Sequence, residues 1–159
     1  MSKENADKEQ KRSFKREAFS WIACIVVTIL LTEFILNFVI INANIPSGSM
    51  ENTIMTNDKL IALRTSYWFN DPKRGDIIIF KYPDDETEWF IKRVIALPGE
   101  TVLVKDGKVY INGSKKALSE PYIKEEPVED FGPYKVPKNG YFVMGDNRNN
   151  SNDAREWET

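Results

Sequence analysis

A run of 24 mostly apolar residues, AFSWIACIVVTILLTEFILNFVII at positions 18–41, constrains this chain more than any other feature. At about 1.5 Å per residue, a helix of this length spans roughly 36 Å, enough to cross the ~30 Å hydrocarbon core of a bilayer. We therefore predict one transmembrane helix over residues 18–41. The run is longer than the apolar core of a secretory signal peptide, and no clean Ala-x-Ala site follows it. We therefore expect a retained anchor.

Charged residues are distributed unevenly around this run. Residues 1–16 carry six Lys and Arg against three Asp and Glu, a net charge of +3, whereas residues 42–159 carry 16 against 19, a net charge of −3. The positive-inside rule then predicts a cytoplasmic basic tail over residues 1–17 and an extracytoplasmic domain after the helix, in a single-pass protein of the cell membrane. Within the run, Glu33 and Asn37 are expected on one side of the helix, with Glu33 protonated or reaching the interface. The overall net charge of −2 gives no indication of nucleic-acid binding.

The sequence beyond residue 42 predicts a mainly β, antiparallel domain. Residues 102–113, VLVKDGKVYING, place Asp106-Gly107 between alternating flanks, which indicates a β-hairpin. Residues 118–139 contain four prolines and are expected to form an ordered but irregular loop. Further strands are expected where β-branched or aromatic residues stand between turn residues, at 59–68, 76–82, 88–97 and 141–144.

Two absences limit the chemistry. The chain contains no histidine, which excludes a Ser-His-Asp triad, a Cys-His dyad and histidine metal ligands within it. Its one cysteine, Cys24, lies in the apolar run, so neither an intrachain disulfide nor a cysteine-based zinc site can form. A serine nucleophile would need a carboxylate or a lysine as its base. A lysine can serve if burial disfavours its charged form.

Two short stretches supply a lysine and a serine. In EWFIKRVIAL, residues 88–97, alternation places Lys92 and Arg93 on opposite faces, and of these two cations only Lys92 can act as a base. In IPSGSM, residues 45–50, Gly48 permits an unusual turn that would expose the Ser49 hydroxyl beside backbone N–H groups. Taken alone, the first stretch favours an ordinary half-exposed strand and the second favours a linker turn.

A third stretch, GDNRNNSNDAR at residues 145–155, is rich in side chains that bond to nearby backbone, which predicts a rigid polar loop. Asp153 and Arg155 could pair as an internal brace, and Ser151 could orient another side chain. No Ser-x-x-Lys motif occurs in the chain. A Ser49/Lys92 pair would therefore have to be assembled in three dimensions across 43 residues.

Together these stretches resemble the successive sequence boxes of bacterial type I signal peptidases, or leader peptidases, of the short Gram-positive type with one N-terminal anchor. Their order and the preceding anchor also match that family. The resemblance implies a β-sheet catalytic domain of the signal-peptidase type. It also implies a serine endopeptidase that cleaves signal peptides from exported preproteins at the outer face of the cytoplasmic membrane, near the export channel. It implies no cofactor or metal. The four boxes are IPSGSM (45–50), KRGDIIIFKYP (73–83), IKRVIALPGE (91–100) and GDNRNNSNDAR (145–155).

Carried over by position, the resemblance makes Ser49 the nucleophile and Lys92 its general base. The Ser47 hydroxyl and the Ser49 backbone N–H would form the oxyanion hole. Ser151 would orient the Lys92 amine. The positions that match the brace of the site are Asp153 and Arg155, and those that match an apolar cleft selecting small side chains, as in Ala-x-Ala, are Ile45, Ile54, Phe90 and Ile91.

The chain departs from the family pattern in a few places. Asn52 stands where proline is usual, and Asn149 and Ala154 replace the common Asp and Ser. The family usually continues through at least one further strand, so we expect this chain, which stops at Thr159, to be truncated. Two alternatives remain: a catalytically silent, membrane-anchored β domain that binds peptides or export components, and a self-cleaving repressor-like Ser/Lys protein. The anchor and the lack of a DNA-binding segment weaken the second.

Overall fold

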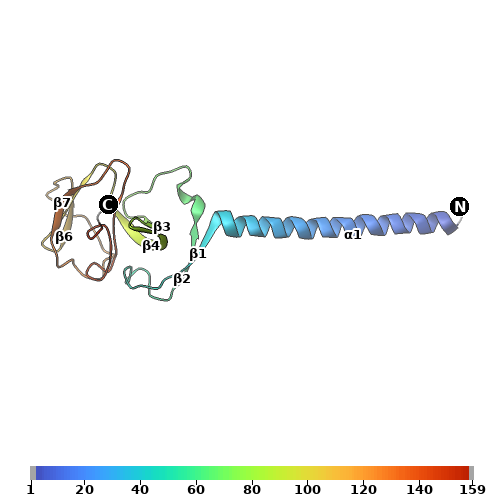
Figure 1. Ribbon diagram of the computed structural model, residues 1–159, viewed down its shortest axis with the longest axis horizontal. Coiled ribbons are helices and arrows are strands. Elements are labelled where there is room, and N and C mark those ends of the chain that lie inside the picture. Colours follow the sequence, from blue (N-terminus) through green and yellow to red (C-terminus); the bar gives the residue numbers. More distant parts are fainter. Residues whose placement is uncertain (1–2, 158–159) are drawn as a thin grey trace. The chain divides into compact units, whose positions relative to one another are not determined.

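The computed structural model describes residues 3–157, with side chains from residue 14 onward (Figure 1). Two compact units are present: an N-terminal helical unit and a domain of antiparallel sheets. Four of the cations in the predicted basic tail, and the chain end at Thr159, lie outside the described side chains.

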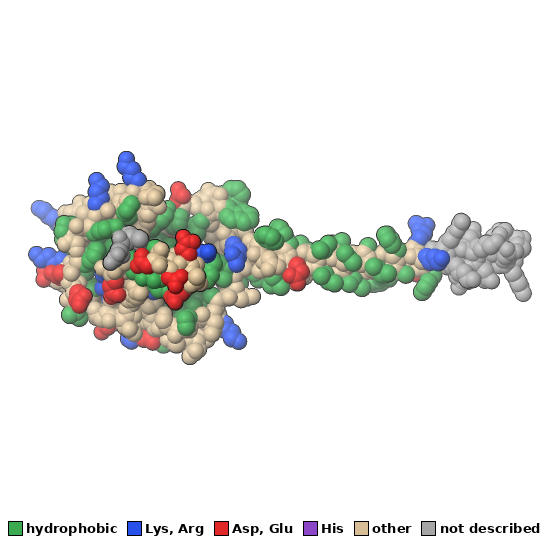
Figure 2. All heavy atoms as spheres, in the orientation of Figure 1, with side chains coloured by type: hydrophobic (Ala, Val, Ile, Leu, Met, Phe, Trp, Pro, Cys, Tyr) green, Lys and Arg blue, Asp and Glu red, His purple; other side chains and the backbone are tan. Residues whose placement is uncertain are grey.

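The helical unit consists of α1, Lys3–Phe34, followed by a π-helical turn, η1, at Ile35–Val39. Its segment Phe14–Val39 has a mean hydropathy of 2.4 and is long and apolar enough to cross a membrane; hydrophobic side chains cover it in Figure 2. The predicted apolar helix is therefore confirmed, although in the structure the helix begins before residue 18 and ends at Val39 instead of residue 41. The helix begins earlier because the charged tail is rich in good helix formers, and it ends at Val39 because residues 40–41 join strand β1, Ile40–Asn44.

Glu33 and Asn37 of the apolar segment contact each other, as their spacing predicts. The Asn37 side-chain amide donates hydrogen bonds to the Glu33 backbone carbonyl at 2.8 Å and to Glu33 Oε2 at 3.1 Å. These bonds satisfy the Asn37 amide within the helix itself.

One three-stranded antiparallel sheet has the order β3–β4–β8, comprising Ile77–Tyr82, Asp85–Ala96 and Phe142–Met144. The long strand β4 is central, with Ile78 opposite Lys92 on one side and Met144 opposite Arg93 on the other. Lys92 therefore lies in the middle of the sheet. A separate two-stranded sheet pairs β1 with β2, Lys59–Leu63.

The third sheet has the order β6–β5–β7, comprising Lys108–Ile111, Thr101–Lys105 and Phe131–Lys135. The predicted hairpin is confirmed: Asp106 and Gly107, with φ of 49° and 74°, form the two-residue turn between β5 and β6. In Figure 1, β6 and β7 lie together, away from β3 and β4. The main core joins these sheets and includes the buried residues Ile95, Val102, Val104, Val109, Val136, Phe142 and Met144.

Two of the predicted segments are wrong in part. The predicted strand 59–68 ends at Leu63 and continues as a 3₁₀ turn, η2, Arg64–Tyr67; its aromatic residues are exposed, so no packing holds them in a strand. The predicted irregular loop 118–139 contains strand β7. Gly132 and Pro133 are residues that usually argue against a strand. However, β7 is an edge strand paired only with β5, and an edge strand tolerates proline.

Replacing Phe142 with alanine should destabilise the β domain by about 3–5 kcal/mol, the usual range for a core phenylalanine. Phe142 is 1% exposed, and its ring lies 5.5 Å from that of Phe131 and 5.7 Å from that of Tyr134. Urea unfolding of the full chain in detergent, followed by tryptophan fluorescence, measures the change. The matched control is Phe69→Ala, since Phe69 is 89% exposed and should change the unfolding free energy by no more than about 0.5 kcal/mol. Equal effects of the two changes would contradict this core assignment.

Candidate active site

The IPSGSM stretch forms a turn fixed by a small apolar cluster. Met50 is fully buried beside Ile45 and Ile54, and Ile77 and Ile91 pack against them. Backbone bonds close the turn, from Glu51 N–H to the Gly48 carbonyl at 3.1 Å and from Ile54 N–H to the Met50 carbonyl at 2.8 Å. Because Met50 is inserted into this cluster, the preceding residue, Ser49, is held at one place against the domain.

The structure brings Ser49 and Lys92 together. Lys92 Nζ lies 2.8 Å from Ser49 Oγ, within hydrogen-bonding distance, although 43 residues separate them in the chain. Both are buried, with exposures of 4% for Lys92 and 5% for Ser49. The turn supplies the hydroxyl, and the centre of strand β4 supplies the amine. This is the arrangement that a base-activated nucleophile needs.

Burial lowers the pKa of the Lys92 ammonium to about 8, although the negative charge of Asp153 acts in the opposite direction. The Lys92 amine also lies over the face of the Phe90 ring, 5.0 Å from its centroid. Its environment therefore supplies little polar solvation. At a pKa of about 8 a minor fraction of Lys92 is neutral near pH 7, and a neutral amine can accept a proton.

Ser47 and Ser151 lie close to this pair. Ser47 Oγ is 3.5 Å from Ser49 Oγ. The Ser151 hydroxyl is buried and is the one such side-chain atom, among the residues described, that lacks a hydrogen-bond partner. A methyl group on Gly145 would collide with both the Ser151 hydroxyl and the Ser49 carbonyl oxygen. The absence of a side chain at Gly145 thus lets the 145–155 loop pack directly against the turn that carries Ser49.

Asp153 and Arg155 form an ion pair inside the same loop. Arg155 donates from Nε to Asp153 Oδ1 at 2.9 Å and from a terminal nitrogen to Asp153 Oδ2 at 3.0 Å. Asp153 also accepts the Gly145 backbone N–H at 2.9 Å, and Arg155 donates to the Arg148 carbonyl at 2.6 Å. The pair therefore ties together the beginning, middle and end of the loop.

The four residues predicted to line an apolar cleft fall into two groups. Ile45 and Ile54 are buried in the cluster around Met50 and present little surface to a ligand. Phe90 and Ile91 are half-buried. The Phe90 ring stacks on Tyr82 at 4.4 Å and lies 5.9 Å from the ring of Trp157.

Sequence reasoning missed two buried ion pairs beside the site. Arg93 binds Asp146 through two hydrogen bonds, at 2.8 and 2.6 Å, and its guanidinium lies 3.9 Å above the Tyr122 ring centroid. Arg148 binds Glu120 at 2.5 and 3.1 Å. The partners are 53 and 28 residues apart, so no local pattern links them. The acidic and basic residues of the GDNR segment offered the only signal.

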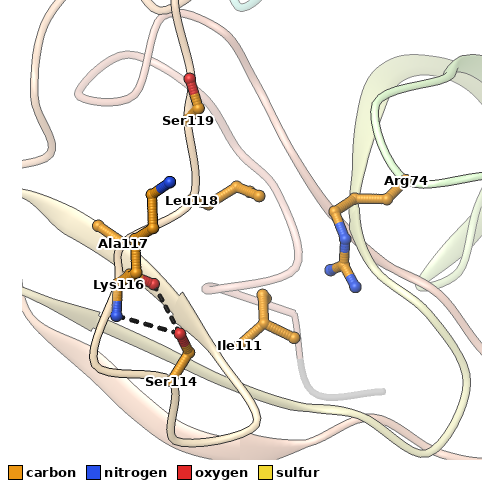
Figure 3. A pocket seen from close by; sticks show the side chains of 7 residues that line it. All are labelled: Arg74, Ile111, Ser114, Lys116, Ala117, Leu118 and Ser119. Atoms are coloured by element: carbon orange, nitrogen blue, oxygen red, sulfur yellow. Dashed lines mark hydrogen bonds between the residues drawn. The ribbon is translucent and has the colours of Figure 1, made fainter.

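A hollow of about 290 Å³ lies elsewhere in the domain and contains none of the predicted site residues (Figure 3). Two of its polar side chains already have partners: Ser114 bonds to the backbone of Lys116, and one terminal nitrogen of Arg74 contacts both carboxylate oxygens of Glu100. We therefore assign no function to this hollow. Its lining residues are Arg74, Ile111, Ser114, Lys116, Ala117, Leu118 and Ser119.

Comparisons with known proteins converge on one family. The family model described as "Signal peptidase, peptidase S26" matches residues 18–159. A Synechocystis protein named "Probable signal peptidase I-2" is 45% identical over 137 residues, which cover 83% of this chain and 62% of that protein. Signal peptidase I of Bacillus amyloliquefaciens is 37% identical over 157 residues, covering 92% of this chain and 82% of its own. A crystal structure of a signal peptidase I from Enterococcus faecalis is 38% identical, covers 54% of this chain and 86% of its own, and aligns with a TM-score of 0.47. This chain thus spans just under two thirds of the length of the Synechocystis protein.

Replacing Lys92 with methionine should stabilise the domain in a pH-dependent way. The pKa of Lys92 is about 8 in the folded chain against the usual 10.5, so below pH 8 both states are protonated and the full cost of burying the ammonium destabilises the fold. Between these pKa values the unfolded chain binds more protons, so the stability of the lysine protein rises with pH. At 1.36 kcal/mol per pH unit the advantage of Lys92→Met is roughly 3 kcal/mol below pH 8, less about 1 kcal/mol for the lost hydrogen bond.

Paired urea unfolding of the two proteins at pH 7 and pH 10 measures this difference. The advantage of Lys92→Met should shrink steadily above pH 8. Lys108→Met, at an exposed position of β6, is the matched control and should show no such dependence. If the difference in unfolding free energy between Lys92→Met and the lysine protein does not change with pH, the pKa of Lys92 is not lowered by burial.

Proposed function

The chain belongs to the peptidase S26 family of signal peptidases, and on that premise we propose that it is a membrane-bound serine endopeptidase that removes signal peptides from exported preproteins with a Ser49/Lys92 dyad. The observation that carries the proposal is the 2.8 Å separation of Ser49 Oγ and Lys92 Nζ in a buried site. The same contact favours an enzyme over the alternative, a catalytically silent β domain that binds peptides or export components, because such a domain has no need of a buried lysine on a serine hydroxyl.

The reaction follows from the two side chains. Neutral Lys92 removes the Ser49 proton as Ser49 Oγ attacks the scissile carbonyl carbon, which gives a tetrahedral intermediate and an ammonium on Lys92. The ammonium then gives its proton to the leaving amine as the peptide bond breaks, and the acyl group remains on Ser49. Lys92, neutral again, takes a proton from a water molecule as its oxygen attacks the acyl carbon. The second tetrahedral intermediate then breaks its bond to Ser49 Oγ, and the Lys92 ammonium returns its proton to that oxygen, which regenerates both groups and releases the acid.

Other residues support these steps in the proposed mechanism. The Ser47 hydroxyl and the Ser49 backbone N–H stabilise the negative charge of the tetrahedral intermediate. The Ser151 hydroxyl, which is buried and has no hydrogen-bond partner in the structure, is proposed to orient the Lys92 amine. Asp153 and Arg155 hold the loop that carries Ser151.

The substrate is the end of a signal peptide with small side chains at the −1 and −3 positions, as in Ala-x-Ala. Phe90 and Ile91 present the apolar surface to it, since they are only half-buried. Ile45 and Ile54 act from beneath, as part of the buried cluster that fixes the shape of the cleft. Large side chains at −1 would require this cluster to move, which close packing resists.

The apolar helix makes the protein a membrane-anchored member of the family. Its N-terminal cations favour a cytoplasmic N-terminus, which leaves the catalytic domain on the outer face of the cytoplasmic membrane. Membrane lipid is then a constant partner, and the signal peptide reaches the dyad close to where it leaves the export channel.

Ser49→Ala, Lys92→Ala and Lys92→Arg should each reduce preprotein cleavage in detergent or vesicles by about 10³-fold or more, since each removes the nucleophile or its base. The arginine variant keeps the positive charge but cannot accept the proton. Ser114→Ala and Lys108→Ala are the matched controls at positions outside the site and should cleave normally. Cleavage retained by the Ser49 or Lys92 variants would contradict the dyad.

The pH dependence of kcat/KM should follow the protonation of Lys92. Below pH 8 the rate should fall about tenfold per pH unit, because only the neutral amine is active, and above pH 8 it should level off. Initial rates of preprotein cleavage between pH 5.5 and 9.5 test this. A limb centred near pH 4–5 would instead indicate a carboxylate base.

A further inference from the structure

Asn147 makes two hydrogen bonds to the nucleophile turn. Its backbone N–H donates to the Ser49 carbonyl at 3.0 Å, and its side-chain amide donates to the Gly48 carbonyl, also at 3.0 Å. Asn147 is 3% exposed and lies 99 residues from Gly48 in the chain. One residue of the 145–155 loop thus holds the carbonyls on both sides of the Ser49 Cα.

These bonds determine where the Ser49 N–H points. The Gly48 carbonyl and the Ser49 N–H belong to one planar peptide unit and, in a trans peptide, point in opposite directions. Holding the Gly48 oxygen therefore fixes the direction of the Ser49 N–H. Glycine is the residue with the freest backbone, so the unit that follows Gly48 gains most from an outside partner. The turn itself provides one further bond to the same oxygen, from the Glu51 N–H.

The residues on each side of Asn147 are immobilised. Asp146 is held by Arg93 and by the Thr53 hydroxyl, which donates to it at 2.5 Å. Arg148 is held by Glu120 and donates to the Gly145 carbonyl at 3.0 Å. Two buried ion pairs thus clamp the backbone of Asn147, which makes it a rigid support for the turn.

We propose that Asn147 is a positioning residue that preorganises the oxyanion hole by holding the Gly48–Ser49 peptide unit in the orientation that presents the Ser49 N–H to the developing oxyanion. The inference rests on the proposed function, since it assigns the Ser49 N–H to that hole. Asn147 does not contact the Lys92 amine in the structure and acts on charge stabilisation rather than on proton transfer.

The test uses full-length Asn147→Ala and Asn147→Asp in detergent or vesicles. Alanine removes the donor, and aspartate places a carboxylate oxygen against the Gly48 carbonyl. In both, kcat should fall about 10- to 100-fold, less than the 10²–10³ typical of losing an oxyanion donor outright, while KM changes less than about threefold. The affinity of a peptide aldehyde, whose hemiacetal with Ser49 mimics the tetrahedral intermediate, should fall in parallel with kcat.

The matched control is Asn149→Asp, the same chemical change two residues away. Asn149 bonds to the backbone of Glu126 and Val128, not to the nucleophile turn, so this variant should keep kcat and aldehyde affinity. A further variant, Asn147→Ser, keeps the backbone bond and a small polar side chain, and it replaces Asn147→Ala if that variant does not fold. The acid limb of the kcat/KM profile should stay in place in every variant.

The outcomes separate this inference from the proposed function. Unchanged kcat and aldehyde affinity in the Asn147 variants, with Ser49→Ala inactive, would overturn the role of Asn147 and leave the dyad intact. A raised KM with unchanged kcat, or a shifted acid limb, would overturn it as well, because these indicate substrate binding or an effect on Lys92. Cleavage retained by Ser49→Ala would overturn both.

Discussion

The burial of Lys92 is the constraint on which the proposed active site depends. An ammonium inside a protein is costly unless it is paired or loses its proton. Here the lysine lies at the centre of a three-stranded sheet, over an aromatic ring and against a serine hydroxyl, with no carboxylate bonded to it among the described contacts. Burial thus lowers the pKa of Lys92 to about 8, so that part of the amine is neutral near neutral pH.

Unlike Lys92, the buried arginines near the site are paired with carboxylates. Arg93, Arg148 and Arg155 each have a carboxylate partner with little or no exposure. Buried ion pairs of this kind contribute little net stability relative to apolar packing but restrict which arrangement of the chain satisfies every charge. These ion pairs therefore act mainly to fix the conformation of the 145–155 loop. These three guanidiniums are paired with carboxylates, whereas the Lys92 amine bonds to the Ser49 hydroxyl, which is consistent with the base role proposed for Lys92.

The sequence predicts the features that depend on local patterns. Residues 18–41 have the composition of an apolar helix, Asp106-Gly107 favours its hairpin, and the β-branched residues around Lys92 favour a strand. Strand β7 escaped prediction because Gly132 and Pro133 oppose a strand in isolation and only pairing with β5 overrides them. The absence of histidine limits the possible bases for a serine nucleophile to a carboxylate or a lysine. The contact of Lys92 with Ser49 and the ion pairs of Arg93 and Arg148 are tertiary contacts, so the spacing of these residues in the chain does not predict them.

Two separate parts of the chain therefore prepare the site for two separate tasks. Strand β4 supplies Lys92, the proposed base, and lowers its pKa through burial, whereas the 145–155 loop fixes the turn that carries Ser49, the proposed nucleophile. Glycine is needed at position 145, where a side chain would collide with the Ser49 carbonyl. A turn containing glycine is soft by itself. The 145–155 loop, held by buried ion pairs, can make this turn rigid without contacting Lys92. The proposed activation of the nucleophile and the proposed stabilisation of the oxyanion can therefore change independently of each other.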